Sequence, residues 1–408
     1  MKRVFTLFLS CLLWYGVPGQ LRMSDLLSFP LTDDEMGVVL AREAYLSTHK
    51  FNSPWLRELD FRLRPNNEET AISDYRLRFG ILNPWEIKAN RDYYKLLLRQ
   101  QTFERKKTIN EVLERRYQLI IEGRYLMSAL AINEANLTQL MKIKQLILEE
   151  SPDDLRELLA MEEEITRQEL AINNLKRKSS ELQPAYLQLG ANALSSFSNE
   201  AWITQEQIQE IVRENMDGES LRLLSDQQDL EREASMLEIN KAEAFSNLGF
   251  IQTEYDAERG DTRDEHIRYQ VGIQIPIFNR DRPDNQRREL ELIEEKAEVA
   301  SLALDEQAQR RSQALSLVDY LSDWLLLQEK KAQLEAYQQA LDESGGTLKQ
   351  RDQFREYRFF LEMKTLSIQM DIYLRYIRFL AGSGELAQQP YLNFLSDALE
   401  PFELERTE

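Results

Sequence analysis

Apolar and polar residues alternate strictly from Ile267 to Phe278, and this stretch organises the interpretation of the whole chain. The apolar positions are Ile267, Tyr269, Val271, Ile273, Ile275 and Ile277. A period of two predicts a β-strand with one apolar and one polar face. Because roughly 9 to 11 tilted residues cross a bilayer, the pattern is typical of a membrane-barrel wall. The apolar residues would face lipid, and Arg268, Gln270 and Gln274 would face water.

The same motif occurs once before, from Tyr75 to Pro84. Gly80 lies 192 positions before Gly272, and Pro84 lies 192 positions before Pro276. Repetition at a constant offset indicates an internal two-fold repeat. Each copy follows a second alternating run, so the sequence predicts two antiparallel β-hairpins, in residues 55–83 and 247–278.

The residues Gly80, Pro84, Gly272 and Pro276 are candidates for a junction between the barrel and the helices that follow it. Glycine permits tight bends, and proline has no N–H group to donate to a strand ladder. The alternative is that the two pairs mark ordinary strand ends.

Long helical segments follow both β-hairpins. Residues 84–178 contain one break, at Ser151 to Asp154, where a serine, a proline and two acids are typical of a helix start. Residues 284–344 contain neither Gly nor Pro, and Gly345 and Gly346 end that run. We therefore predict antiparallel helical hairpins at 84–178 and 279–382, with Gly382 ending the second.

Spacing by three and four residues predicts a coiled-coil seam early in the second helical hairpin. The seam residues are Leu290, Ile293, Ala297, Ala300 and Leu304.

The rest of the chain divides into shorter segments. A basic start and the apolar run 4–17 predict a cleaved signal peptide at 1–20. The other segments are an N-terminal helix in 21–54, an equatorial insertion at 179–220, a return helix at 221–246 and a C-terminal tail at 383–408. Cys11 is the sole cysteine and lies in the signal peptide, so neither a disulfide framework nor a cysteine-based metal site is expected. A lipoprotein in which Cys11 is lipidated is the less favoured alternative to a cleaved signal peptide.

The composition argues against several functional classes. The formal net charge of −19 disfavours nucleic acid as a partner, because phosphate binding needs a basic face. The chain has two histidines, His49 and His266, and lacks a glycine-rich phosphate loop and a nucleophile elbow. We therefore predict neither an enzyme nor a bound cofactor or metal.

The order of strand pair, helical hairpin, strand pair and helical hairpin resembles the TolC-type outer-membrane efflux protein family. The most specific similarity lies in Tyr269 to Phe278, and Tyr373 to Gly382 also resembles the closing helix of the family. The resemblance implies a mainly α fold with a small β part. Three copies would form a twelve-stranded outer-membrane barrel on an α-barrel tunnel that extends into the periplasm. From the residues alone, four strands cannot close a barrel of at least about eight, so an oligomer of open number is required.

The resemblance also implies partners and a function. It points to a homotrimer that contacts outer-membrane lipid, a periplasmic adaptor (membrane fusion) protein and an inner-membrane pump. The function would be the exit duct of a tripartite efflux or type I secretion system, with the cargo open. The alternative is a periplasmic coiled-coil scaffold without a pore.

A periplasmic constriction is implied near the second hairpin tip, where the family places aspartates. Asp352 is the candidate, six residues after Gly346, and Arg351 and Arg355 flank it. The candidate partners of these arginines at the first tip are Asp153, Asp154 and Glu157. The alternative is that all six are solvated charges near helix ends.

Overall fold

The computed structural model describes residues 22–31, 33–49, 56–65, 72–81, 83–150, 155–190, 200–244, 249–256, 267–272, 282–344 and 347–404. The expected signal peptide with Cys11 lies outside these residues, as do Asp153, Asp154, His266, Gln274, Pro276 and the strand positions after Gly272.

The chain forms two compact units. The sheet unit comprises Gly37–Arg105 and Leu221–Glu306, and the tip unit comprises Met1–Met36, Lys106–Ser220 and Gln307–Glu408. Two long helices, α4 (Pro84–Glu150) and α8 (Arg282–Ser344), contribute residues to both units. None of the helices in the described ranges combines the length and the apolar character needed to cross a membrane.

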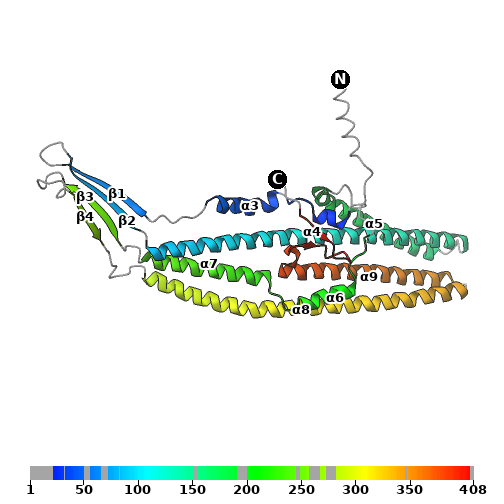
Figure 1. Ribbon diagram of the computed structural model, residues 1–408. Coiled ribbons are helices and arrows are strands. Elements are labelled where there is room, and N and C mark those ends of the chain that lie inside the picture. The colour runs from blue at the N-terminus through cyan, green and yellow to red at the C-terminus, as the bar shows by residue number, and fades with distance from the viewer. Residues whose placement is uncertain are drawn as a thin grey trace, which may run out of the picture. The chain divides into compact units, whose positions relative to one another are not determined.

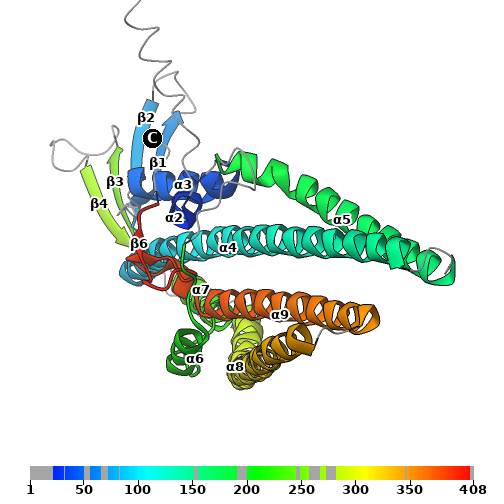
Figure 2. The same cartoon turned by 90° about the vertical axis from the view of Figure 1, so that its right-hand side faces the viewer.

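The sheet unit contains four strands that lie side by side (Figure 1, Figure 2). They are β1 (Leu56–Pro65), β2 (Ile72–Ile81), β3 (Phe250–Asp256) and β4 (Ile267–Gly272), in that order across the sheet. Every neighbouring pair is antiparallel. The two predicted β-hairpins are confirmed, and they join each other through β2 and β3.

Most of helix α3 (Asp33–Thr48) belongs to the sheet unit, where it lies along α4. Gln101 Nε2 of α4 donates to the Val39 carbonyl at 2.7 Å, and Arg105 Nη1 donates to Glu43 Oε1 at 3.2 Å. The Tyr94 hydroxyl donates to the Leu46 carbonyl. These polar contacts attach α3 to α4 while Val38 and Tyr45 remain largely exposed.

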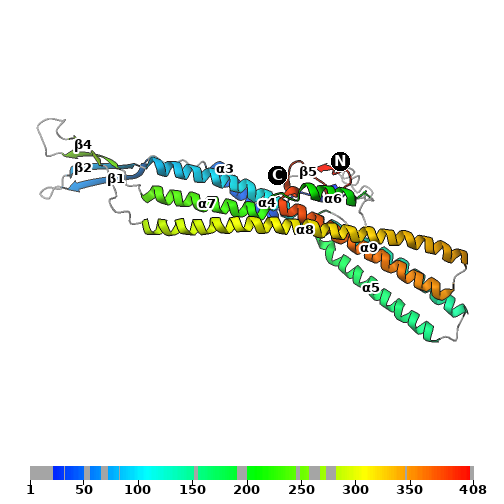
Figure 3. The same cartoon turned by 90° about the horizontal axis from the view of Figure 1, so that it is seen from below.

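The tip unit contains the ends of both helical hairpins. Helix α5 (Leu155–Gln188) returns along α4, and α9 (Leu348–Ser383) returns along α8, as Figure 3 shows most clearly for α8 and α9. An apolar core joins the first pair, and its members are Leu140, Ile143, Ile147, Met161 and Ile165. Helix α9 buries Leu361, Ile368, Ile372 and Ile377. The core between α4 and α5 holds the first hairpin together by excluding water from apolar side chains.

The helical elements confirm the offset of 192 residues. Adding 192 to the first residue of α5 gives position 347, next to Leu348 at the start of α9. The same shift places α3 within α7 (Leu221–Ala244). Each repeat therefore contains a short helix, a strand pair and a long helical hairpin.

Two predicted helix ends were wrong. Helix α5 continues ten residues beyond Lys178 and includes Pro184. Its last turn is anchored because the fully buried Tyr186 donates its hydroxyl to the Leu119 carbonyl of α4. Helix α9 continues to Ser383 and is capped by Gly384 rather than Gly382, because Gly384 has a φ of 75°, which favours glycine.

Ordered structure in the C-terminal tail was missed, whereas a short helix in the insertion agrees with the broken pattern of that segment. The tip unit contains α2 (Met23–Leu27), α6 (Gln205–Glu214), a short 3-10 helix (Glu385–Ala387), and the strands β5 (Tyr391–Leu392) and β6 (Pro401–Phe402). Tyr117 of α4 anchors this tail. Its hydroxyl donates to the Leu392 carbonyl at 2.7 Å and accepts from the Phe394 N–H at 3.1 Å.

Candidate functional site: the two-faced sheet and the hairpin tips

One face of the sheet consists of mostly apolar rows whose side chains are exposed or half-buried. The strand register aligns Leu63 with Tyr75, Tyr255 and Ile267, then Phe61 with Leu77, Thr253 and Tyr269, then Leu59 with Phe79, Ile251 and Val271. Tyr269 and Val271 are 77% and 73% exposed. A soluble sheet covers such a face with helices or a second sheet. This face lacks such a cover among the described residues, so its apolar side chains need a non-aqueous partner.

The opposite face carries charged and polar rows. The register aligns Arg62 with Arg76, Glu254 and Arg268, then Asp60 with Arg78, Gln252 and Gln270, then Glu58 with Gly80, Phe250 and Gly272. Arg76 Nη2 lies 3.0 Å from Glu254 Oε1, and Arg62 Nη2 lies 2.9 Å from Asp60 Oδ2. The predicted division of the second strand pair, with Ile267, Tyr269 and Val271 opposite Arg268 and Gln270, is confirmed for the described residues.

Two strands of the sheet are long enough for a membrane wall, and the sheet has two open edges. Strands β1 and β2 each contain 10 residues, which matches the roughly 9 to 11 that cross a bilayer at a tilt. Within the described part of the chain, β1 and β4 each pair on one side only. Their outer N–H and C=O groups are therefore free to pair with strands of further copies.

The coiled-coil seam is also exposed. Leu290, Ile293 and Leu304 on α8 are 62%, 61% and 70% exposed, and Ala297 and Ala300 are exposed beside them. The spacing predicted a seam, and in the described chain this seam faces outward. Helix α8 thus presents an apolar stripe that can pack against a helix of another subunit.

The junction residues differ in their surroundings. Pro84 is the first residue of α4, and Asn83 before it caps the helix, because Asn83 Oδ1 accepts from the Trp85 N–H at 3.0 Å. The buried Asn83 also donates to the Ala242 carbonyl of α7 at 3.3 Å. Sequence reasoning missed Asn83, although an Asn-Pro pair before a helical pattern is a capping signal.

Gly272 provides space for an aromatic ring. A Cβ atom there would lie 2.2 Å from Phe250 Cε1, whereas one at Gly80 would lie 3.4 Å from Glu58 Cβ, an ordinary contact. The two glycines are equivalent in the repeat, but only Gly272 is required by the packing of a neighbouring side chain.

At the second tip, Asp352 and Arg355 form an ion pair on α9. Arg355 donates to Asp352 Oδ1 from Nε at 3.0 Å, and its Nη2 lies 2.9 Å from the same oxygen. Arg355 Nη1 also donates to Asn136 Oδ1 of α4 at 2.7 Å. The side chain of Arg355 is only 12% exposed, so this contact links the two helical hairpins away from bulk water.

Two further tip candidates, Arg351 and Glu157, lie on the surface. Arg351 is exposed next to Asp352, and Glu157 is exposed in the first turn of α5. A capping box of Thr347 and Gln350 starts α9, since the Thr347 N–H donates to Gln350 Oε1 at 2.9 Å and Thr347 Oγ1 accepts from the Gln350 N–H at 3.4 Å. The structure therefore brings Asp352 and Arg355 together, and it adds Asn136, which sequence reasoning missed.

A buried polar contact lies close by along α4. Gln168 of α5 donates from Nε2 to Asn133 Oδ1 at 2.7 Å, and Asn133 Nδ2 lies 3.5 Å from Met363 Sδ of α9. Asn133, Asn136 and Gln168 are all buried. Polar residues on the apolar stripes of α4 and α5 were the only sequence signal for this connection.

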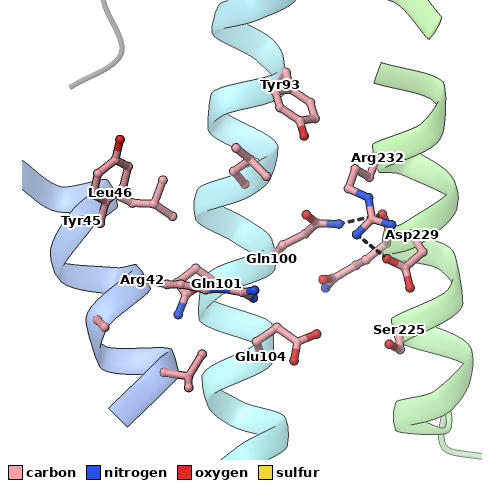
Figure 4. Close-up of a pocket in the computed structure, with 14 residues that line it drawn as sticks. Arg42, Tyr45, Leu46, Tyr93, Gln100, Gln101, Glu104, Ser225, Asp229 and Arg232 are labelled. Carbon is pink, nitrogen blue, oxygen red and sulfur yellow. Dashed lines mark hydrogen bonds and ion pairs between the residues drawn. The ribbon is translucent and has the colours of Figure 1, made fainter. Parts of the chain in front are cut away.

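A cavity of about 800 Å³ lies in the sheet unit between α3, α4 and α7. Figure 4 shows side chains from the three helices around it, with Gln100 and Gln101 on α4 between α3 and α7. Arg232 pairs with Asp229 at 3.0 Å, and Gln100 Nε2 donates to the Gln228 carbonyl at 3.0 Å.

Across the described ranges, no group of three or more His, Cys, Asp or Glu side chains is placed to hold a metal ion.

Comparison with known proteins identifies the fold. No protein-family model and no curated protein matches this sequence. Solved structures do match. The outer-membrane channel OprN aligns with a TM-score of 0.61 at 11% identity, covering 89% of this chain and 88% of that chain.

Two further channels align similarly. The Campylobacter jejuni CmeC outer-membrane channel has a TM-score of 0.57 at 10% identity, covering 93% of this chain and 86% of that chain. The open state of the Neisseria gonorrhoeae MtrE outer-membrane channel has a TM-score of 0.58 at 12% identity, covering 89% and 88%. This chain therefore has the fold of these outer-membrane channels, as the resemblance to the TolC-type efflux proteins implied.

Proposed function

We propose that this chain is one subunit of an outer-membrane channel. Its strands would join strands of further copies in a β-barrel, and its helices would extend into the periplasm as a tunnel. The channel would serve as the exit duct of a tripartite efflux or type I secretion system.

The two-faced sheet is the observation that carries this proposal. Its apolar rows are exposed on one face, two of its strands are long enough to cross a bilayer at a tilt, and its other face is charged. Lipid on one side and water on the other satisfy both faces at once. A water-soluble sheet of this kind would expose Tyr269 and Val271 to solvent.

The open edges and the exposed seam support an oligomer. Membrane-inserted strands cannot leave N–H and C=O groups unpaired in hydrocarbon, so β1 and β4 must find partners. We infer a homotrimer, in which four strands per copy make a twelve-stranded barrel. The stripe that contains Leu290, Ile293 and Leu304 would pack between copies.

The likeness to solved outer-membrane channels supports the remaining partners. We propose outer-membrane lipid around the barrel, and a periplasmic adaptor with an inner-membrane pump at the helical end.

The periplasmic end would be narrowed at the hairpin tips. We propose that Asp352 contributes one carboxylate per subunit to a ring near the axis, which would attract cations. Its contact with Arg355, and the contact of Arg355 with Asn136, would hold α9 against α4 when the end is closed. Arg351, Asp153, Asp154 and Glu157 remain candidates for contacts between neighbouring hairpins.

Membrane fractionation and electrical recording test the proposal together. A barrel oligomer will co-sediment with outer membranes, migrate as a heat-modifiable species on gels, and form ion-conducting pores in planar bilayers. A periplasmic scaffold without a pore would be released as a soluble protein on lysis. Soluble release without conductance would refute the channel.

A further inference from the structure

The long helices of the tip unit lie in the order α5, α4, α9 and α8, as Figure 2 shows. An apolar core joins α5 to α4. The contact of Arg355 with Asn136 joins α4 to α9, and the hydrogen bond from Arg375 Nη2 to the Tyr320 hydroxyl, 2.9 Å long, joins α9 to α8. Helices α5 and α8 are therefore the two ends of this series.

The two end helices expose apolar side chains at a spacing of eleven residues. Leu159 and Leu170 of α5, and Leu326 and Tyr337 of α8, are each more than half exposed. Eleven residues make about three helical turns, so each pair lies on one face of its helix. On α5 this face points away from α4, because Leu170 lies about 200° around the helix from Gln168, which is hydrogen-bonded to α4. We call the two pairs the α5 stripe and the α8 stripe.

The internal repeat preserves the alignment of packed helices. In two antiparallel helices, contacting residues have nearly the same sum of residue numbers at every level. Pairs that join α4 to α5 give sums from 301 to 310, and they include Asn133 with Gln168 and Glu134 with Lys176. In the second hairpin, Arg375 Nη1 donates to Ser316 Oγ at 3.3 Å, with a sum of 691. Subtracting the offset of 192 from both numbers gives 307, so the two hairpins pack in the same register.

The joint between the two hairpins predicts the register of a joint between two copies. Contacts of α4 with α9 have a sum of 491 for Asn136 with Arg355 and of 496 for Asn133 with Met363. The offset converts α4 into α8 and α9 into α5. One number rises by 192 while the other falls by 192, so the sum does not change. A contact between α8 and the α5 of a neighbouring copy should therefore also have a sum of 491 to 496.

We propose that the α8 stripe of one copy packs against the α5 stripe of the next copy, with Leu326 facing Leu170 and Tyr337 facing Leu159. Both pairs have a sum of 496, which lies within the range found between α4 and α9. Two sets of exposed apolar side chains thus meet at the level that the repeat predicts and exclude water from each other. This inference rests on the proposed channel, because it requires further copies of the chain, and it names the helices that join them.

Disulfide cross-linking of the assembled full-length oligomer tests this register. The matched variants are Leu170→Cys with Leu326→Cys, and Leu159→Cys with Tyr337→Cys. Mild oxidation should convert both into covalent species of two and three subunits. A disulfide requires Cα atoms roughly 4.4 to 6.8 Å apart, so these products would report direct contact between the two stripes.

The crossed variants use the same four positions as controls. Leu170→Cys with Tyr337→Cys, and Leu159→Cys with Leu326→Cys, are out of register by eleven residues, about 16 Å along a helix. They should give roughly ten-fold less covalent product, because this displacement exceeds the reach of a disulfide. Cys11 is the same in every variant, and the four single-cysteine variants measure cross-linking between like positions.

The outcomes separate the interface from the channel. Equal cross-linking of matched and crossed variants, a disulfide that forms only within one chain, or no covalent product in oligomers that form pores would overturn the interface and leave the channel standing. The last of these results is expected if the stripes bind a different protein, such as a periplasmic adaptor. Failure of the unmodified chain to form any heat-modifiable oligomer or pore would overturn both proposals.

Discussion

The orientation of the sheet can be tested by placing one arginine on either of its faces. Val271 and Gln270 are adjacent residues of β4, and both are exposed in the single chain. Val271 belongs to the apolar row of Leu59, Phe79 and Ile251, whereas Gln270 belongs to the charged face. Val271→Arg and Gln270→Arg therefore introduce the same side chain one residue apart, toward lipid or toward water.

The row of Val271 sets the expected cost. Residues on one face are two apart, about 6.8 Å along a strand, which is about 5 Å along the membrane normal at a tilt near 45°. The middle apolar row contains Phe61 and Tyr269. If this row lies at the midplane, Val271 lies about 5 Å from it. An arginine costs about 2 to 4 kcal/mol at the midplane and about 0 to 1 kcal/mol at the interface.

We therefore expect Val271→Arg to destabilise the inserted barrel by about 2 kcal/mol per subunit, and Gln270→Arg by less than about 0.5 kcal/mol. The assay is reversible folding into phospholipid vesicles in urea, followed by the heat-modifiable band and tryptophan fluorescence. In a trimer the cost accrues three times, so assembly should fall steeply for Val271→Arg alone. Equal losses for the two variants, or a larger loss for Gln270→Arg, would refute the assignment of the faces.

Three further changes follow from the packing. Gly272→Val should lower the yield of oligomer, because the new valine side chain would collide with Phe250 and destabilise the sheet by about 1 to 3 kcal/mol. Gly80→Ala should leave the yield unchanged. Equal yields of the two variants would contradict this packing argument. Asp352→Asn should weaken cation selectivity or divalent-cation block in single-channel recordings, and unchanged values would exclude Asp352 from the constriction. Tyr117→Phe should destabilise the tip unit by about 1 to 3 kcal/mol in urea, because two buried backbone groups lose their partner. Burial also raises the pKa of Tyr117, so its contribution to stability is present below about pH 10 and is lost as the pH rises further. The alkaline loss should be smaller in Tyr117→Phe.

Local periodicity predicted the regular elements well. The alternation from Trp55 to Arg64 became β1 at Leu56–Pro65, and Pro84 is the first residue of α4. These predictions succeeded because a segment with one buried face must place its apolar residues at the period of its own geometry. The constant offset of 192 residues then determined the order of elements, since both repeats carry the same pattern.

Ends of elements were predicted less well where distant residues control them. Helix α5 continues past Pro184 because Tyr186 is hydrogen-bonded to α4. The C-terminal tail is ordered because the hydroxyl of Tyr117 hydrogen-bonds to its backbone. The partners in these contacts are 67 to 277 residues apart in sequence. A pattern within one segment contains no information about them.

The candidate site divides in the same way. The sequence by itself determined which residues share a face of the sheet, because a strand has a side-chain period of two. Only the tertiary structure aligned Arg62, Arg76 and Arg268 in one row, placed Phe250 over Gly272, and joined Arg355 to Asn136. Register between strands and contact between helices depend on how separate segments pack, and packing is decided by the shapes and charges of residues far apart in the chain.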